Sequence, residues 1–222
     1  MTINQCAAGT SVRRSHSLVT VTGVAGIGYA LSWIAGLAIP APNPALGASG
    51  TAILGAYAGH QASAAVNFAL TEGLPAIGIA VVTLALARAT GGPLGRVLRA
   101  AGLTATAISV AEFVLGLIVT RTRDAGAAHL LWASIDRIDG VKMLAFAVLG
   151  VAAYLATATS YRAAVLPRWL RYCAAALAVT MTVSGLVYLM LAQALVIAAG
   201  PALLFLLVVI TGAGIVLGSR AR

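Results

Sequence analysis

Charged residues are scarce in this chain. Only 9% of its 222 residues are charged, whereas about a quarter of the residues of a soluble domain are. So few charges cannot cover a surface that faces water, and a soluble globular domain is therefore excluded. The hydrophobic content of 61% indicates a bundle of helices in a lipid bilayer, and 24 glycines with only 6% aromatic residues predict that these helices pack closely.

Acidic residues are the rarer of the two charged classes. Asp and Glu number 5 against 14 Lys and Arg, which gives a net charge of +9. In a soluble domain this balance would suggest a nucleic-acid partner, but in a membrane protein basic residues hold short loops in the cytoplasm. We therefore expect the lipid bilayer as a partner and no nucleic acid.

Sequence motifs of several large protein classes are missing. The chain has no Walker loop, no GxGxxG or GxSxG pattern, and no pair of histidines in its apolar segments placed to hold haem. These absences disfavour ATPases, Rossmann oxidoreductases, serine hydrolases and dihaem cytochromes. Cys6 and Cys173 lie without CxxC or Cys/His spacing, so we predict no disulfide, no metal site and no cofactor.

Apolar runs of the length that crosses a bilayer, about 20 residues, recur along the chain. They predict an all-α fold with six transmembrane helices, at about 17–39, 66–87, 98–120, 140–159, 169–191 and 197–218. Residues 1–16 form a polar cytoplasmic tail, and residues 17–219 form a single transmembrane helical bundle. Prolines at 40, 42 and 44 end the first span, and the segment 45–65 is either an interfacial helix or an outer extension of the second span.

The positions of the basic residues predict the orientation. Short cytoplasmic loops are enriched in Lys and Arg, and ten arginines fall on one side of the predicted spans: Arg13, Arg14, Arg88, Arg96, Arg99, Arg162, Arg168, Arg171, Arg220 and Arg222. This side has no acid. We therefore expect a multi-pass protein of the cell membrane with both termini in the cytoplasm.

All the acids map to the outer half of the bundle or its loops. They are Glu72, Glu112, Asp124, Asp136 and Asp139. Arg121, Arg123, Arg137 and Lys142 map to the same half, where the orientation rule alone would not place them. These bases need partners, and the nearby acids are the candidates.

Glu112 is the sharpest candidate for a functional residue. It lies within AISVAEFVLGLIV, with about a dozen apolar or small residues on either side. An ionised carboxylate there is costly, so the group must be protonated, paired or in a watery cavity. Its candidate partners are Arg121, Lys142 and His60, and a purely structural ion pair or interhelical hydrogen bond remains an alternative.

The stretch HLLWASIDRIDGVK, from His129 to Lys142, reads as a helix that enters the fourth span. Asp136 and Asp139 share one face of this helix with Trp132. Two carboxylates so close resist simultaneous ionisation unless a base intervenes. The alternative is a network of interfacial salt bridges that anchors the helix end.

Glu72 lies a few residues into the second span, where Gly73 and Pro75 can open the backbone hydrogen-bond ladder. By helical rise it lies in the outer third of the bilayer, near the depth of Glu112, so the two acids are expected to face one cavity. His60, Asn67 and Thr71 recur on one helical face if the helix begins before residue 60. Exposed positions near the lipid headgroups are the alternative for this group. The other aromatic residues are scattered and read as packing or interfacial residues.

The order of an IAGL helix, an acid in the third span, a D/K pair opening the fourth and LPRWL before the fifth resembles small six-helix actinobacterial membrane proteins. In size and character the chain is also similar to bacterial membrane-bound terpene cyclases of the indole sesquiterpenoid type. The second resemblance implies a buried acid that protonates an isoprenoid alkene or epoxide, with carboxylates and aromatics steering the cation.

The leading hypothesis is a membrane enzyme that performs acid chemistry on a lipophilic small-molecule substrate. Glu112 is the proton donor, with Glu72, Asp136 and Asp139 as further catalytic residues, one Asp relaying the proton from outside. The residues assigned to substrate binding are His60, Asn67, Trp132, Lys142 and Phe113. A small proton-coupled transporter and a structural or accessory membrane subunit are the alternatives.

Overall fold

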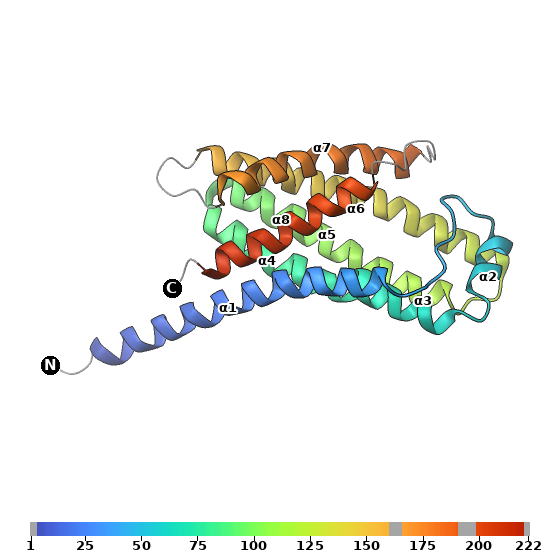
Figure 1. Ribbon diagram of the computed structural model, residues 1–222, viewed down its shortest axis with the longest axis horizontal. Helices are drawn as coiled ribbons and strands as arrows, with labels where there is room; N and C mark the ends of the chain where they lie inside the picture. The colour runs from blue at the N-terminus through green and yellow to red at the C-terminus, as the bar shows by residue number, and fades with distance from the viewer. Residues whose placement is uncertain (1–3, 160–165, 191–198, 220–222) are drawn as a thin grey trace.

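The computed structural model describes the backbone of residues 4–159, 166–190 and 199–219, and the side chains of residues 21–156, 166–189 and 201–219. All regular elements in these ranges are helical (Figure 1). In order they are α1 (Asn4–Leu37), α2 (Gly50–Tyr57), α3 (Gln61–Phe68), the π-helical turn η1 (Ala69–Gly73), α4 (Leu74–Thr90), α5 (Gly92–Val119), α6 (Ala125–Thr159), α7 (Arg168–Met190) and α8 (Ala199–Ser219).

Five described segments are long and apolar enough to cross a membrane. They are Gln61–Thr90, Gly92–Val119, Ala125–Ala156, Arg168–Leu189 and Pro201–Ser219. They agree with the second to sixth predicted spans. For the first predicted span, 17–39, the apolar part within the described side chains is the shorter stretch Val21–Leu37 of α1. The chain is therefore a multi-pass helical membrane protein.

Two helices begin well before the apolar runs that predicted them. The second span begins at Gln61 rather than at 66, and the fourth at Ala125 rather than at 140. At the second of these starts, Asp124 accepts a hydrogen bond from the Ala127 amide through its side chain, at 2.7 Å. A helix starts at its cap, whereas an apolar run marks only where lipid begins, which explains the difference. The predicted helix through HLLWASIDRIDGVK is confirmed.

The segment 45–65 divides between the two predicted alternatives. Helix α2 is a separate short helix, whereas α3 continues through η1 into α4 as an extension of the second span. Gly50, the first residue of α2, touches the start of α6 so closely that an added Cβ would lie 1.7 Å from the Ala125 carbonyl oxygen. Only glycine fits this contact, which holds α2 across one end of the bundle.

Helix α6 lies between α5 and α7, and α1 packs against α4 and α8. The start of α1, the turn between α4 and α5 and the end of α8 lie at one end of the molecule, and α2 lies at the other (Figure 1). The exposed residues Arg88, Arg96 and Arg99 flank the α4–α5 turn. The predicted separation of this arginine-rich end from the acids therefore holds for these residues.

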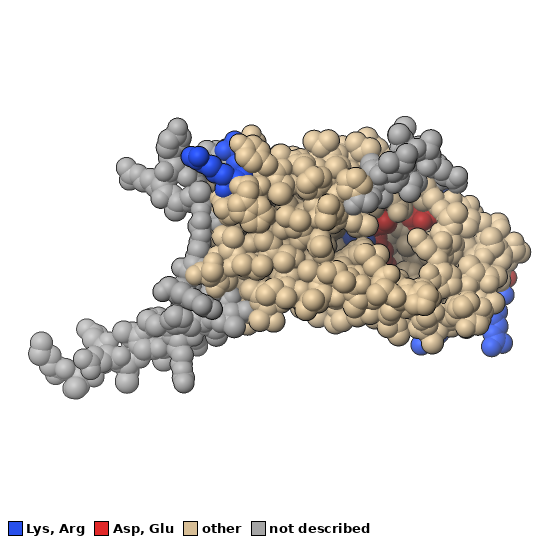
Figure 2. Space-filling view, viewed as in Figure 1, with Lys and Arg blue, Asp and Glu red and all other residues tan. Residues whose placement is uncertain are grey.

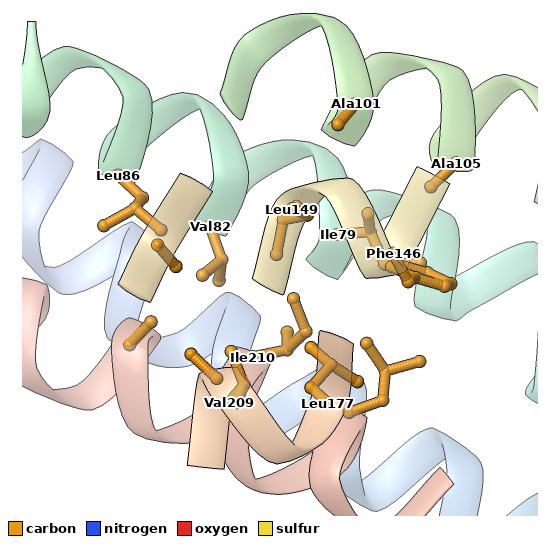
Figure 3. Close-up of a cluster of buried hydrophobic side chains, with 14 of the residues drawn as sticks. Ile79, Val82, Leu86, Ala101, Ala105, Phe146, Leu149, Leu177, Val209 and Ile210 are labelled. Atoms are coloured by element: carbon orange, nitrogen blue, oxygen red, sulfur yellow. The ribbon is translucent and has the colours of Figure 1, made fainter. Parts of the chain in front are cut away.

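The buried apolar side chains form two clusters. The larger joins α4, α6, α7 and α8 through residues such as Ile79, Phe146, Leu177 and Ile210 (Figure 3). The smaller cluster lies near α2 and includes Ile53, Ala128 and Trp132. Members of both clusters line one cavity, so a polar site lies between two apolar layers.

Candidate functional site

Three carboxylates converge on one ammonium group in this cavity. Lys142 Nζ lies 2.9 Å from Glu72 Oε2 and 2.8 Å from Asp139 Oδ1, and it also donates to Glu112 Oε2. The side chains are 8% exposed for Lys142, 2% for Glu112, 14% for Glu72 and 19% for Asp139. These residues, called the Lys142 cluster below, join three separate spans of the bundle.

The backbone around Glu72 departs from α-helical geometry. Pro75 has no amide hydrogen, and its ring would collide with the carbonyl group four residues earlier. In η1 the ladder widens, and the Leu74 amide donates to the Ala69 carbonyl, five residues back. Such π-turns are frequent at functional sites. Glu72 lies on this one, and its side chain contacts Lys142. Gly73 and Pro75 were expected to open the ladder here.

The other members of the cluster come from regular helices. Glu112 lies in the second half of α5, and Asp139 and Lys142 are one turn apart on α6. Residues at that spacing share a helix face, so α6 supplies both a base and an acid. Glu112 Oε1 is buried and has no hydrogen-bond partner among the described residues. One oxygen of this carboxyl group therefore bonds to Lys142, and the other makes no hydrogen bond to the described part of the protein.

The cavity has a volume of about 660 Å³, within the roughly 300–1,000 Å³ of small-molecule sites. Figure 2 shows a hollow on one face of the molecule, with acidic and basic side chains inside it. All four members of the Lys142 cluster line the cavity. The structure therefore combines a charged centre with room for a guest molecule.

Aromatic side chains gather around this cavity, contrary to the expectation that they are scattered. The lining includes Tyr29, Trp33, Tyr57, Phe68, Trp132, Phe146 and Tyr188. The spacing of Tyr29, Trp33 and Leu37 along one face of α1 was the available signal. Of the aromatic lining residues, Trp132 was predicted as a substrate-binding residue. The others were missed as site residues, because they come from helices whose pairing the sequence did not predict.

Tyr57 lies on the short helix α2, outside the membrane-spanning segments. Burial, and after it the charge of Asp136, raises the pKa of its hydroxyl. That hydroxyl is buried without a hydrogen-bond partner among the described residues. Tyr57 therefore places an uncharged, unbonded O–H group in the wall of the cavity.

A loop of residues 38–49 covers the end of the cavity near α2. Three side chains of α6 hold it: Asp136 Oδ2 accepts from the Gly47 amide at 3.2 Å, Trp132 Nε1 donates to the Ala45 carbonyl at 3.3 Å, and His129 Nδ1 lies 3.1 Å from the Ala48 carbonyl. Loop residues 39 and 41–46 line the cavity. Asp136 thus contacts the loop, whereas Asp139 contacts Lys142.

The structure brings most of the predicted site residues together. Glu112, Glu72, Asp136, Asp139, Lys142, Trp132 and Asn67 line the cavity. Asn67 also donates to the Gly36 carbonyl at 2.9 Å, which ties α3 to the end of α1. Of the candidate partners for Glu112, the structure selects Lys142, and Arg121, Arg123 and Arg137 are exposed.

His60 and Phe113 are not among the residues that line the cavity. The helix begins at Gln61, after a turn at Gly59 whose φ is +74°. The condition that would have placed His60 on the face of Asn67 is therefore not met, and His60 is exposed. The Phe113 ring instead packs 3.3 Å from where a Cβ on Gly73 would lie.

The acids of the cluster do not form a metal site. Among the side chains that the structure describes, no group of three or more His, Cys, Asp or Glu lies as metal ligands would. Lys142 occupies the space between the three carboxylates.

Comparisons of the chain with protein-family models, curated proteins and solved structures gave no match.

Proposed function

We propose that this protein is a membrane-embedded enzyme in which Glu112 acts as a general acid on a lipophilic substrate. One observation carries the proposal: Glu112 lines a cavity large enough for a small molecule, with one oxygen held by Lys142 and the other buried without a hydrogen-bond partner among the described residues. A proton on Oε1 then has no acceptor in the described protein, and a guest that packs directly against Glu112 can receive it.

The charge balance of the cluster supports a stored proton. If all three carboxyl groups were ionised, one lysine would face three negative charges in a place nearly closed to water. Neighbouring carboxylates resist simultaneous ionisation, so one of the three holds a proton at neutral pH. Glu112 is the most deeply buried of them, and an uncharged carboxyl is favoured most where water is least available.

The chemistry suited to this arrangement is protonation of an alkene or epoxide, the class that the resemblance to membrane terpene cyclases implies. In the alkene case, the electron pair of the double bond takes the Glu112 proton and the electrons of the O–H bond stay on the carboxylate. Lys142 stabilises that carboxylate. The aromatic side chains that line the cavity face this carbocation. The carbocation then loses a proton to the Glu112 carboxylate, either directly or by way of Asp139, and Glu112 is again an acid.

Deuterium transfer tests this proposal. Membranes containing the protein are incubated in deuterium oxide with geranylgeraniol or its terminal epoxide, and the products are analysed by mass spectrometry. We expect deuterium in the product from the wild type and not from Glu112→Gln. Asp124→Asn is the matched control, because Asp124 lies outside the cavity and Asn also caps helices. Deuterium incorporation by Glu112→Gln at the wild-type rate would contradict the role of Glu112.

A proton-coupled transporter is the second candidate, and η1 is the observation that favours it. Transporters bind substrate and ions at interrupted helices, and Glu72 lies on such an interruption. Proton-driven uptake into proteoliposomes, lost in Glu72→Gln and not accompanied by any product, would favour transport. Stable co-purification with a larger complex, without either activity, would favour an accessory subunit.

The orientation in the membrane follows from the basic residues. The described arginines around the α4–α5 turn and at the start of α7 lie at the end of the bundle where α1 begins and α8 ends (Figure 1). Positive loops stay in the cytoplasm. On this reading, α1 is a sixth span, both termini are cytoplasmic, and the Lys142 cluster lies in the outer half of the bilayer.

A further inference from the structure

Helices α1 and α8 touch tightly at one level and diverge from there toward the end that carries α2 (Figure 1). A Cβ on Gly26 would lie 3.0 Å from Gly214 Cα and 3.2 Å from the Thr211 carbonyl oxygen. The Thr211 hydroxyl donates to the Gly26 carbonyl at 3.2 Å. Small residues allow such close approach of two backbones in a membrane, so this contact fixes where the helices part.

Beyond this contact, an apolar space of about 290 Å³ lies between the two helices. We call it the α1–α8 slot, and it is lined by Tyr29, Trp33, Ile34, Leu37, Leu203, Leu204 and Leu207. Three of these apolar residues, Ile34, Leu37 and Leu204, are strongly exposed. In a membrane bundle, exposed apolar side chains face lipid. The slot therefore opens toward lipid.

The slot adjoins the cavity of the Lys142 cluster. Tyr29, Trp33, Leu37 and Leu203 line both spaces. The hollow visible in Figure 2 exposes charged side chains on this lateral face of the molecule, and not at one of its ends. A molecule with one end at the cluster can therefore place its other end in the slot.

We propose that the α1–α8 slot seats the single hydrocarbon chain of a substrate that enters from the bilayer, and that the head of this substrate carries no negative charge. The chain must be apolar, because the slot offers almost no polar groups apart from the Tyr29 and Trp33 tips. The Gly26–Gly214 contact closes the slot at its far end and so limits the chain length.

The limit on the head, which rests on the proposed function of the cluster, follows from its charge. Lys142 already faces three carboxyl groups. An anionic head would bring a further negative charge into this poorly solvated site without a second base, and like charges repel strongly at low dielectric. Phosphate and diphosphate esters are therefore excluded as substrates, and alcohols, epoxides and other uncharged heads are admitted.

Photolabelling tests both parts of the proposal. The wild type is reconstituted in phosphatidylcholine vesicles and irradiated with a long-chain alcohol that carries a diazirine at its tail, and labelled residues are identified by mass spectrometry. We expect labels at slot residues of α1 and α8.

Two variants and a second ligand serve as comparisons. Leu204→Trp fills the slot and should lower labelling there at least fivefold. Ile77→Trp, at a similarly exposed position on α4 (62% exposed, against 59% for Leu204), should not change the labelling of the slot. The corresponding alkyl phosphate should label the slot at least tenfold less.

Several outcomes would overturn the proposal. Labels spread evenly over the lipid-facing surface, or unchanged slot labelling in Leu204→Trp, would refute the seat for the chain. Equal labelling by the phosphate would refute the limit on the head. The Glu112→Gln variant separates this inference from the proposed enzyme: retained slot labelling with lost deuterium transfer supports both, whereas retained labelling with no transfer in the wild type contradicts the enzyme alone.

Discussion

Lys142 on α6 donates a hydrogen bond to Glu112 on α5, between side chains that are only 8% and 2% exposed. A single pair so deeply buried would usually add little to stability, because desolvation offsets the Coulomb attraction. Here Lys142 also binds Glu72 and Asp139, so one cation is shared among three spans. Stability alone therefore gives little reason for so many charged groups in this cavity.

Removal of Lys142 should lower the free energy of unfolding far more than removal of a neighbouring base. Lys142→Met leaves three carboxyl groups without their cation, and breaking a buried pair costs about 3–5 kcal/mol. Arg137→Met, on the same helix but exposed, should change the free energy of unfolding by no more than about 0.5 kcal/mol. Unfolding of both variants in detergent, followed by circular dichroism, provides the measurement.

The double variant Lys142→Met/Glu112→Gln checks the cause of that loss. Because the two side chains are directly paired, the double variant should be more stable than the sum of the single changes implies. Equal stability losses for Lys142→Met and Arg137→Met, or strict additivity in the double variant, would show that the contact between Lys142 and Glu112 does not carry the effect.

Two glycines of α1 should respond in opposite ways to substitution. Gly26→Leu forces α1 from α8, because an added Cβ already meets backbone atoms of Gly214 and Thr211, and overpacking of this kind costs about 1–3 kcal/mol. At Gly28 nothing lies within 4 Å of the added atom, so Gly28→Leu should be neutral or slightly stabilising in a helix. Thermal unfolding of the two purified variants measures this difference in stability. Equal stability of the two variants would contradict the close α1–α8 contact.

The sequence was informative about helices and about single costly residues. Apolar runs predicted five segments that the structure shows at membrane-spanning length, and the apolar surroundings of Glu112 predicted its burial. Such features are local, since each depends on residues within one helix. Starts of helices were predicted less well, because caps such as Asp124 are set by hydrogen bonds and not by apolarity.

The meeting of the three acids on Lys142 could not be predicted from the sequence. Glu72 lies 70 residues and Glu112 lies 30 residues from Lys142 along the chain. Which of the outer bases they would meet depends on how α4, α5 and α6 pack. For the same reason Tyr29 and Tyr188 were not recognised as cavity residues, and the apolar α1–α8 slot has no sequence motif at all.

Tyr57 should make the protein sensitive to alkaline pH. An unfolded tyrosine releases its proton at pH about 10, whereas burial raises the pKa of the Tyr57 hydroxyl in the folded protein. Above that pH the unfolded chain binds fewer protons than the folded one, so stability falls as pH rises. Tyr57→Phe should unfold at a higher pH than the wild type, as followed by circular dichroism, and an unchanged alkaline midpoint would contradict burial of the hydroxyl.

The loop of residues 38–49 should be released by loss of its anchors on α6. Asp136→Ala removes the acceptor of the Gly47 amide, and Trp132→Phe removes the donor to the Ala45 carbonyl while keeping an aromatic ring in the cavity wall. Each hydrogen bond contributes about 0.5–1.5 kcal/mol, or more when one partner is charged, so amide hydrogen exchange in the loop should accelerate by about threefold to tenfold. Ser134→Ala is the control, because Ser134 is exposed on α6 and bonds only to the Leu130 carbonyl of its own helix. Exchange that is equally slow in all three variants would mean that α6 does not hold the loop over the cavity.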